Sequence, residues 1–434
     1  MLMRYYSTHH KAQPVSFREA VINGLALDGG LYIPGSIPSF TSKFIKHLHR
    51  RTLQDIGFIV AKQYIEDEIP ARKLKALVKD TLNFEIPLVE IENNIHCLEL
   101  FHGPTLAFKD VGARFMARVL GYFAQDFKKE IIVLVATSGD TGSAVANGFL
   151  GVDGVKVVIL YPSGKVSEIQ EKQLTTLGQN ITALEVDGNF DDCQRLVKTA
   201  FGDEQLKQNL TLTAANSINI ARLIPQSFYY FYAWTQLKDR KKPVVFSVPS
   251  GNFGNLTGGL LAKEMGLPVQ RLIAATNIND IVPHYLETGQ YQPKPSQKTI
   301  SNAMDVGDPS NFARMYVFYG NSRKRMTEAI QGLSFDDEET LATIRHVHQR
   351  TGYLLDPHGA VGYLGLKKYL EQHATTGIFL ETAHPAKFAD IIEKAIDAKA
   401  PIPDRLTLCM DKEKHAIQIG NKYDDLHQFL NDTF

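Results

Sequence analysis

A glycine-rich turn at residues 251–255 has the composition of an anion-binding loop. The apolar run VVFSVPS at 244–250 leads into Gly251, Asn252, Phe253, Gly254 and Asn255, and the following LTGGLLAKEMG has the apolar spacing of a helix. Backbone amides at such a turn attract anions, and glycines let the chain approach a phosphate closely. A plain strand-to-helix turn remains the alternative, since the turn matches neither the GxGxxG pattern nor a GK[ST] phosphate loop.

A second polar loop, TSGDTGS at residues 137–143, follows a strongly apolar run. It places Ser138, Asp140 and Thr141 at the end of a predicted strand and the beginning of a predicted helix. Ligands of open α/β sheets bind at that edge of the sheet. Ser, Thr and Asp are also preferred helix-capping residues, so capping alone is the competing interpretation.

A lysine among apolar neighbours, Lys109 in the segment HGPTLAFKD at 102–110, is the candidate nucleophile. Most such lysines lie at the surface with their aliphatic stems on apolar neighbours. Desolvation beside cationic or phosphate-binding groups would instead lower the pKa of the amine and let it form a Schiff base. We predict no metal, because HExxH is absent and the pairs His47/His49 and His346/His348 point to different sides of a helix.

The elements that must position these loops are predicted by the hydrophobic pattern. From about residue 131, apolar runs alternate with turn signals and helical patterns, which is typical of a buried parallel sheet. Strands are predicted at 131–137, 155–161, 181–187, 211–217, 244–250, 271–277 and 377–382, and helices at 143–149 and 168–177. We predict an α/β fold that is doubly wound, with mostly parallel sheets in two lobes.

Length and composition divide the chain further. A chain of 434 residues exceeds the size of a single hydrophobic core. Residues 1–80 contain the turn-rich GGLYIPGSIP at 29–38 and charge clusters, so we predict a separate N-terminal subdomain. Residues 291–309, rich in Pro, Ser, Asn and Asp, are predicted to form a long connecting or active-site loop.

Charge and cysteine content exclude several classes of partner. The 47 basic and 47 acidic side chains balance, so the chain lacks the positive field expected for nucleic-acid binding. Cys97, Cys193 and Cys409 are widely spaced and odd in number, which favours a reducing compartment. No segment resembles a signal peptide or a membrane span. We expect a cytoplasmic protein with neither a nucleic-acid nor a membrane partner, and we predict no particular oligomeric state.

The three loops together resemble those of the threonine synthase family, which belongs to the fold-type II pyridoxal-phosphate enzymes with tryptophan synthase β and cysteine synthase. The segments that match this family run through most of the chain. They are YYSTHHKAQPVSFREAVINGLALDGGLYIP (5–34), HGPTLAFKD (102–110), ATSGDTGSA (136–144), NSINIAR (216–222), SGNFGN (250–255), AMDVGDPSNFAR (303–314) and LETAHPAKF (380–388). The resemblance implies that residues 81–434 form the pyridoxal-phosphate-dependent catalytic domain, with a smaller lobe of roughly residues 121–214 inserted in a larger one.

The resemblance implies a cofactor, pyridoxal 5'-phosphate, and the residues that bind it. Lys109 resembles the lysine that holds the cofactor covalently, and Thr382 resembles the hydroxyl residue that contacts the pyridine nitrogen. Asp140 stands where related enzymes commonly have an asparagine at the ring oxygen. The cofactor phosphate would bind at Gly251, Asn252, Phe253, Gly254 and Asn255.

The resemblance also implies contacts to the substrate. Ser138 and Thr141, in the same loop as Asp140, resemble residues that receive the α-carboxylate. The polar set around the substrate phosphate would comprise Ser217, Asn219, Arg222 and Arg314, and arginine suits a phosphate by its bidentate geometry. One departure concerns His9 and His10, which stand where many relatives carry an Arg-Gly-like pair.

The implied activity is that of a lyase that converts O-phospho-L-homoserine and water to L-threonine and phosphate, the final step of threonine biosynthesis. Lys109 would act as the general base at Cα and as the shuttle for later proton transfers. Two alternatives remain. The same scaffold could act as an O-phosphohomoserine phospho-lyase or catalyse another elimination or β-replacement. The chain could also be a noncatalytic regulatory protein that binds a phosphate ligand, although an intact Lys109 argues against this.

Overall fold

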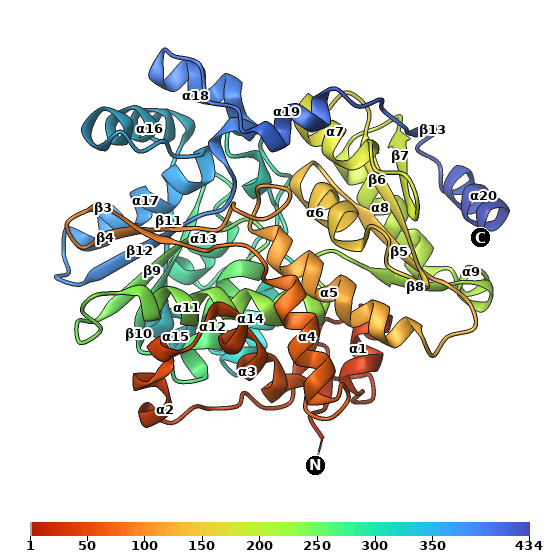
Figure 1. Ribbon diagram of the computed structural model, residues 1–434, viewed down its shortest axis with the longest axis horizontal. Helices are drawn as coiled ribbons and strands as arrows, with labels where there is room; N and C mark the ends of the chain where they lie inside the picture. Colours follow the sequence, from red (N-terminus) through yellow and green to blue (C-terminus); the bar gives the residue numbers. More distant parts are fainter. Residues whose placement is uncertain (1) are drawn as a thin grey trace.

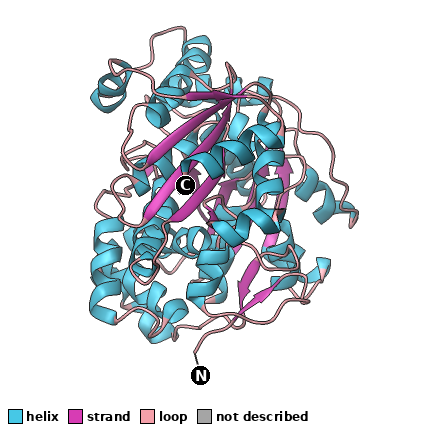
Figure 2. Ribbon diagram, turned by 90° about the vertical axis from the view of Figure 1, so that its right-hand side faces the viewer, coloured by secondary structure: helices cyan, strands magenta, loops and turns pink. Residues whose placement is uncertain are grey.

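A large six-stranded sheet, a small five-stranded sheet and an N-terminal part with a two-stranded sheet and helices make up the structure, a computed structural model that describes residues 2–434 (Figure 1). The large sheet and the small sheet lie on opposite sides of helix α5 (Lys109–Ala124), and the N-terminal helices lie beneath them in this view. Figure 2, turned by 90°, shows helices packed around the strands. In the described residues, no helix is both long enough and apolar enough to cross a membrane.

The large sheet has six strands in the order β11-β10-β9-β12-β4-β3, and only the edge pair β3 and β4 is antiparallel. The strands are β3 (Leu88–Glu92), β4 (Ile95–Glu99), β9 (Val244–Pro249), β10 (Val269–Thr276), β11 (Ile330–Ser334) and β12 (Thr376–Glu381). Along β9, Phe246 packs in the core that contains α11 (Phe228–Gln236) and α12 (Gly254–Glu264), whereas Val245 packs in the core that contains α17 (Pro357–Leu370). This alternation places helices on both faces of the sheet, as predicted.

The small sheet is parallel throughout, in the order β13-β7-β6-β5-β8. Its strands are β5 (Ile131–Ala136), β6 (Val155–Pro162), β7 (Ile181–Val186), β8 (Thr211–Ala214) and β13 (Ile417–Ile419). Val133 faces the core of α5, and Leu134 faces α8 (Phe190–Gly202) and α20 (Tyr423–Thr433). Because β13 and α20 come from the C-terminal segment, the predicted span of 121–214 leaves out part of the unit built on this sheet.

The N-terminal part combines a two-stranded antiparallel sheet with four α-helices. Its elements are β1 (Tyr5–Ser7), α1 (Phe17–Asn23), β2 (Tyr32–Pro34), α2 (Ser42–Lys46), η1 (Leu48–Arg50), α3 (Leu53–Ile65) and α4 (Ala71–Thr81). A capping box of Ser16 and Glu19 begins α1. The Arg114 guanidinium of α5 donates to the carbonyls of Asp80 (2.7 Å) and Thr81 (3.1 Å), so the end of α4 is fixed against α5.

The remaining helices cover the sheets and connect the strands. They are α6 (Asp140–Phe149), α7 (Glu168–Thr175), α9 (Glu204–Asn209), α10 (Ile220–Leu223), η2 (Ile224–Ser227), α13 (Ile281–Thr288), η3 (Asn302–Met304), α14 (Phe312–Phe318), α15 (Arg323–Ala329), α16 (Asp337–Thr351), η4 (Pro385–Phe388), α18 (Ala389–Ile396) and α19 (Asp404–Met410). The predicted loop at 291–309 contains only η3. The strand predicted at 211–217 ends at Ala214, because Asn219 then caps α10.

Candidate active site

Lys109 is the first residue of α5, and backbone hydrogen bonds connect the segment before it to the residues that follow β12. The Phe108 amide donates to the Thr382 carbonyl (2.8 Å), and the His384 amide donates to the Leu106 carbonyl (3.0 Å). Leu106 has a left-handed φ of 57°, which is uncommon for a residue other than glycine. The contacts bring the lysine segment and the Thr382 segment together at the carboxyl edge of the large sheet.

The turn before α5 is closed by Asp110. Its carboxylate accepts hydrogen bonds from the amide (2.8 Å) and the hydroxyl (2.6 Å) of Thr105. Burial raises the pKa of Asp110 to about 6, although the Thr105 hydrogen bonds and the charges of Lys387 and Arg114 act in the opposite direction. Asp110 therefore holds the backbone that presents Lys109.

The Lys109 amine lies in a partly buried, positively charged environment. In residues 2–434, no carboxylate lies within ion-pair distance of its nitrogen. Burial, opposed in part by the charge of Asp140 and assisted by Arg222 and Lys387, lowers the pKa of Lys109 from its ordinary value of 10.5 to about 8. An amine of this kind is a nucleophile for a carbonyl group near neutral pH, which favours the desolvated lysine over the surface lysine.

A second lysine, Lys387 of η4, was not predicted to belong to the site. Its ammonium is fully buried, lies 2.5 Å from an Asp140 carboxylate oxygen and donates to the Thr105 carbonyl (3.0 Å). The same Asp140 oxygen accepts a hydrogen bond from the Gln170 amide (2.9 Å). In the sequence, Lys387 lies within the segment LETAHPAKF (380–388) that also contains Thr382, and it stands between Ala386 and Phe388, an apolar setting that could have indicated burial.

The glycine loop joins β9 to α12, as predicted. In residues 2–434, no acceptor pairs with the backbone amides of residues 251–255. The left-handed backbone angle occurs at Phe253 (φ 59°), not at a glycine. Gly251 is required for close approach instead, because a Cβ there would lie 2.7 Å from the Met304 Cα and 2.9 Å from the Ala303 carbonyl oxygen. The free amides at the start of α12 form an anion-binding arrangement.

Asn252 connects this loop to two other predicted segments. Its side-chain amide donates to the Ser217 hydroxyl (2.7 Å) and its side-chain carbonyl accepts from the Ser310 amide (2.6 Å). Asn311, which the sequence analysis did not single out, donates to the Asn252 backbone carbonyl (2.9 Å). The side chain of Asn255 makes a hydrogen bond inside the loop region, because its amide donates to the Pro249 carbonyl (2.8 Å). Ser217 and Asn252 are therefore brought together.

The second polar loop follows β5 and begins α6. Thr137 braces it from inside, since its hydroxyl oxygen accepts from the amides of Gly139 (3.0 Å) and Gly142 (2.8 Å). Gly139 has a φ of 146°, and a Cβ there would lie 2.5 Å from the Gln170 side-chain oxygen, so only glycine fits. Ser138 is exposed and Thr141 is partly buried. Their hydroxyls are thus accessible to a small ligand.

The predicted phosphate residues differ in how far their polar groups are already used. Asn219 is fully buried, donates to the Val21 and Ala214 carbonyls and caps α10. The buried Arg314 guanidinium donates to the carbonyls of Tyr32 (3.0 Å) and Ser217 (3.1 Å) and joins the N-terminal part to the main chain of the site.

Arg222, by contrast, keeps an unused donor. Its Nε is buried and has no partner in residues 2–434, and burial lowers the pKa of its guanidinium to about 10. Of the predicted phosphate residues, Arg222 therefore has the geometry most suited to an anion, whereas Asn219 and Arg314 make structural contacts. The substrate role of all three stays a prediction.

Thr382 follows β12 and is buried, and its hydroxyl makes no hydrogen bond within residues 2–434. The neighbouring Glu381 is fully buried, and burial together with the Asp356 charge raises the pKa of Glu381 well above its usual range. One Glu381 oxygen accepts from the Asp356 amide, while the other has no partner in residues 2–434. A neutral carboxyl thus lies behind the strand end that carries Thr382.

The parallel strands explain why these segments meet. β9 and β12 are adjacent, so the glycine loop and Thr382 leave the same edge of the large sheet. The Asn216 side chain donates to the Ala136 carbonyl (3.1 Å), which connects the 216–222 segment to the end of β5. Lys387 connects Thr105 to Asp140 across the two lobes.

These residues fit pyridoxal 5'-phosphate. The free amides of residues 251–255 suit its phosphate, and the amine of Lys109 suits its aldehyde. The Thr382 hydroxyl, which has no partner in residues 2–434, suits its pyridine nitrogen, and Asp140 together with the ammonium of Lys387 suits its ring oxygen.

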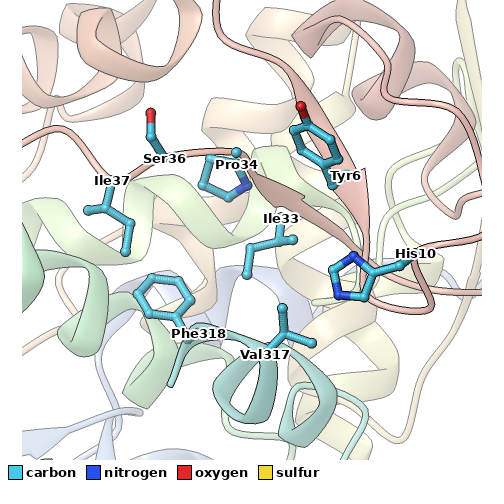
Figure 3. A pocket seen from close by; sticks show the side chains of 9 residues that line it. Tyr6, His10, Ile33, Pro34, Ser36, Ile37, Val317 and Phe318 are labelled. Atoms are coloured by element: carbon cyan, nitrogen blue, oxygen red, sulfur yellow. The ribbon is translucent and has the colours of Figure 1, made fainter. Parts of the chain in front are cut away.

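A cavity of about 370 Å³ lies elsewhere, between the end of β2 and α14 (Figure 3). Tyr6 and His10 face the apolar side chains of Ile33, Val317 and Phe318 across it. No residue assigned to the cofactor or substrate lines this cavity. His10 therefore belongs to a different surface from Lys109.

Three family models together match nearly the whole chain. "Pyridoxal-phosphate dependent enzyme" matches residues 81–380, "Threonine synthase N terminus" matches residues 4–82, and "Threonine synthase, C-terminal" matches residues 359–430. These matches confirm the predicted cofactor, pyridoxal phosphate, and the predicted fold class.

Individual relatives agree with the family models over the full length. The chain is 47% identical to threonine synthase of Haemophilus influenzae over 429 residues, which cover 99% of each chain. The solved structure of threonine synthase from Escherichia coli matches with a TM-score of 0.92 at 43% identity and covers 100% of both chains. The structure of pyridoxal-phosphate-bound threonine synthase from Brucella melitensis matches with a TM-score of 0.93 at 36% identity and covers 99% of both. The chain therefore belongs to the threonine synthase family, and its activity is the pyridoxal-phosphate-dependent synthesis of threonine.

Proposed function

We propose that the substrates are O-phospho-L-homoserine and water and that the products are L-threonine and phosphate. The observation that carries this proposal is the Lys109 amine, whose pKa of about 8 lets it take up and release protons near neutral pH. It lies among groups suited to anions, including the free amides of residues 251–255 and the Arg222 guanidinium. The substrate carries a phosphate and an α-carboxylate, which match this surplus of donors.

Each part of the cofactor has a residue proposed for it. Lys109 would hold the aldehyde carbon, residues 251–255 the phosphate, Thr382 the pyridine nitrogen and Asp140 the ring oxygen. A threonine hydroxyl can donate to or accept from the pyridine nitrogen but, unlike a carboxylate, does not hold it protonated. When bound, the cofactor supplies the electron sink for carbanion chemistry.

The α-carboxylate of the substrate would lie against Ser138 and Thr141. This part of the proposal is supported by the braced loop, in which Thr137 fixes the backbone and leaves both hydroxyls accessible. The substrate phosphate would lie toward Ser217 and Arg222, since Arg222 has the unused Nε donor. Asn219 and Arg314 would shape this region through their backbone contacts.

Lys109 would carry the protons of the reaction. Its neutral amine takes the Cα proton of the substrate, and the amine can then deliver and remove protons at the carbons that follow along the chain. Loss of phosphate from Cγ and addition of water at Cβ complete the net conversion. A single amine with a pKa near neutrality can serve both directions of transfer, whereas an ordinary lysine would stay protonated.

Identification of the organic product tests this proposal. The purified holoenzyme is incubated with O-phospho-L-homoserine in ¹⁸O-labelled water, and the products are identified by mass spectrometry. We expect L-threonine carrying one ¹⁸O atom, together with phosphate that has no ¹⁸O. Accumulation of 2-oxobutyrate instead would support the phospho-lyase alternative, and absence of any turnover with an intact cofactor spectrum would support the regulatory one.

We also propose that the enzyme acts in the cytoplasm and that its domains are residues 1–80 and 81–434. The three cysteines are all free, as expected in a reducing compartment. The N-terminal boundary is supported by the end of α4 at Thr81. β13 and α20 extend the unit around the small sheet beyond residues 121–214.

A further inference from the structure

Lys387 is a fully buried lysine whose position in the fold is set by the end of β12. It lies in η4, and its ammonium is 2.5 Å from the Asp140 carboxylate and 3.0 Å from the Thr105 carbonyl oxygen. Burying a lysine is costly unless the charge is paired and hydrogen-bonded. Both conditions are met here, and the partner is a residue at the cofactor ring in the proposed function.

The Asp140 carboxylate is consequently an ion and not a neutral acid. Burial alone would raise its pKa, but the charges of Lys387 and Lys109 and the hydrogen bonds from Lys387 and Gln170 lower it below the usual range. The groups that face Asp140 are Lys387 from η4, Gln170 from α7 and Lys109 from α5. Two lysines thus share one carboxylate, and only Lys387 is in direct contact with it.

The charges that face Lys109 come from three elements. Asp140 at the start of α6 attracts its ammonium form, whereas Arg222 of α10 and Lys387 of η4 disfavour it. If Lys387 were neutral, the buried Asp140 carboxylate would lose its counter-ion. The nearest remaining cation in the site that could compensate it is Lys109. That ion pair would stabilise the protonated form of the Lys109 amine, which cannot act as a nucleophile or a base.

We propose that Lys387 is a positioning residue of the reaction: its buried ammonium holds the Asp140 carboxylate, which leaves the Lys109 amine free to bind the cofactor and to transfer protons. The inference rests on the proposed role of Lys109. In this inference, the Asp140–Lys387 ion pair lies at the ring oxygen of the cofactor. Related enzymes that have asparagine at the position of Asp140 place a neutral side-chain amide there instead.

The test measures how the reactivity of Lys109 depends on pH in the full-length chain freed of cofactor. Pyridoxal 5'-phosphate is added between pH 6 and 10, the adduct is reduced with borohydride, and its rate of formation on the Lys109 peptide is measured by mass spectrometry. In the parent, the midpoint is expected near pH 8. In Lys387→Met, it should rise by about one unit, with about tenfold slower labelling at pH 7.

Matched variants separate this role from a structural one. Lys387→Arg keeps the charge and should keep the parent midpoint. The double variant Lys387→Met/Asp140→Asn removes both charges and should return the midpoint toward the parent value, because no unpaired carboxylate remains. A lysine that only filled space would change the melting temperature of the variants without moving the pH midpoint.

The outcomes that overturn the inference are distinct from those that overturn the proposed function. A Lys387→Met midpoint equal to that of the parent, or a double variant shifted as far as Lys387→Met, refutes the positioning role. If Lys387→Met does not fold, Lys387→Gln replaces it, and loss of folding in both while Lys387→Arg folds also counts against the inference. Labelling of the parent at a lysine other than Lys109 would instead refute the proposed function.

Discussion

Replacement of Lys109 by methionine should stabilise the cofactor-free chain at neutral pH. The side chain stays unbranched and becomes one atom shorter, and the charge is removed from a site where burial, Arg222 and Lys387 disfavour it more than Asp140 favours it. Residues that serve chemistry are often costly for stability in this way. The substitution is expected to abolish covalent cofactor binding and turnover at the same time.

The size and pH dependence of the effect follow from the pKa of Lys109. The fall from 10.5 to about 8 corresponds to about 3 kcal/mol at 1.36 kcal/mol per unit, and partial exposure reduces this to about 1–2 kcal/mol. The pKa of Lys109 is lower in the folded state than in the unfolded state, so below pH 8 the charged amine destabilises the folded state by the full amount. This destabilisation is relieved as the pH rises from 8 to 10.5, because the folded state loses its proton first. At pH 7, the same shift makes the neutral amine about 300-fold more abundant than in an ordinary lysine.

Thermal unfolding of the cofactor-free chains at pH 7.0 and 9.5 measures the effect. For a chain of this length, the expected stabilisation raises the apparent melting temperature by about 1–2 °C at pH 7.0. Less than half of this difference should remain at pH 9.5. Lys73→Met, on the exposed face of α4, is the control and should show no such pH dependence. A Lys109→Met chain that is less stable than the parent at pH 7.0, or a difference that does not change with pH, would refute the reasoning.

Two further substitutions test the cofactor residues. Gly251→Ala should weaken cofactor binding at least tenfold, because the new Cβ would lie 2.7 Å from the Met304 Cα and displace the loop; unchanged affinity in a visible-absorbance titration would argue against the glycine loop. Thr382→Asp should bind cofactor but lose threonine formation disproportionately in a product assay, because a carboxylate would hold the pyridine nitrogen protonated. Thr382→Ser should retain most of the activity, and parent-like turnover in both variants would remove Thr382 from the ring.

The fold could be predicted where the side-chain pattern alone determines the structure. The strand predicted at 131–137 is observed as β5 (Ile131–Ala136), and its buried residues alternate between two cores, as Val133 and Leu134 show. β13 could not be predicted in the same way. It has three residues, two of them exposed, and it pairs with β7 only because α20 docks its apolar residues against α8.

The candidate site was predictable where residue type and local spacing carry the function. The glycine loop lies between the strand and the helix that were expected on either side of it. The special conformations were less predictable, since Phe253 and Leu106, not glycines, take left-handed angles. Arg314 has the residue type expected at a phosphate, yet its guanidinium bonds to backbone carbonyls. Lys387 was missed because its partner, Asp140, is distant in the sequence and only the packing of the two lobes joins them.

The charges of the site connect its stability to its ligands. Lys109, Arg222 and Lys387 are all at least partly buried, whereas Asp140 contacts only Lys387 directly and Asp110 is the carboxylate whose charge acts on Arg222. Such a surplus of positive charge is unfavourable in the protein alone, as the lowered pKa values of Lys109 and Arg222 indicate. It becomes less unfavourable when a phosphate enters, because Arg222, whose Nε has no partner in residues 2–434, then gains a counter-ion. The cost that Lys109→Met should relieve therefore arises from the same positive environment that favours phosphate binding at the carboxyl ends of the strands.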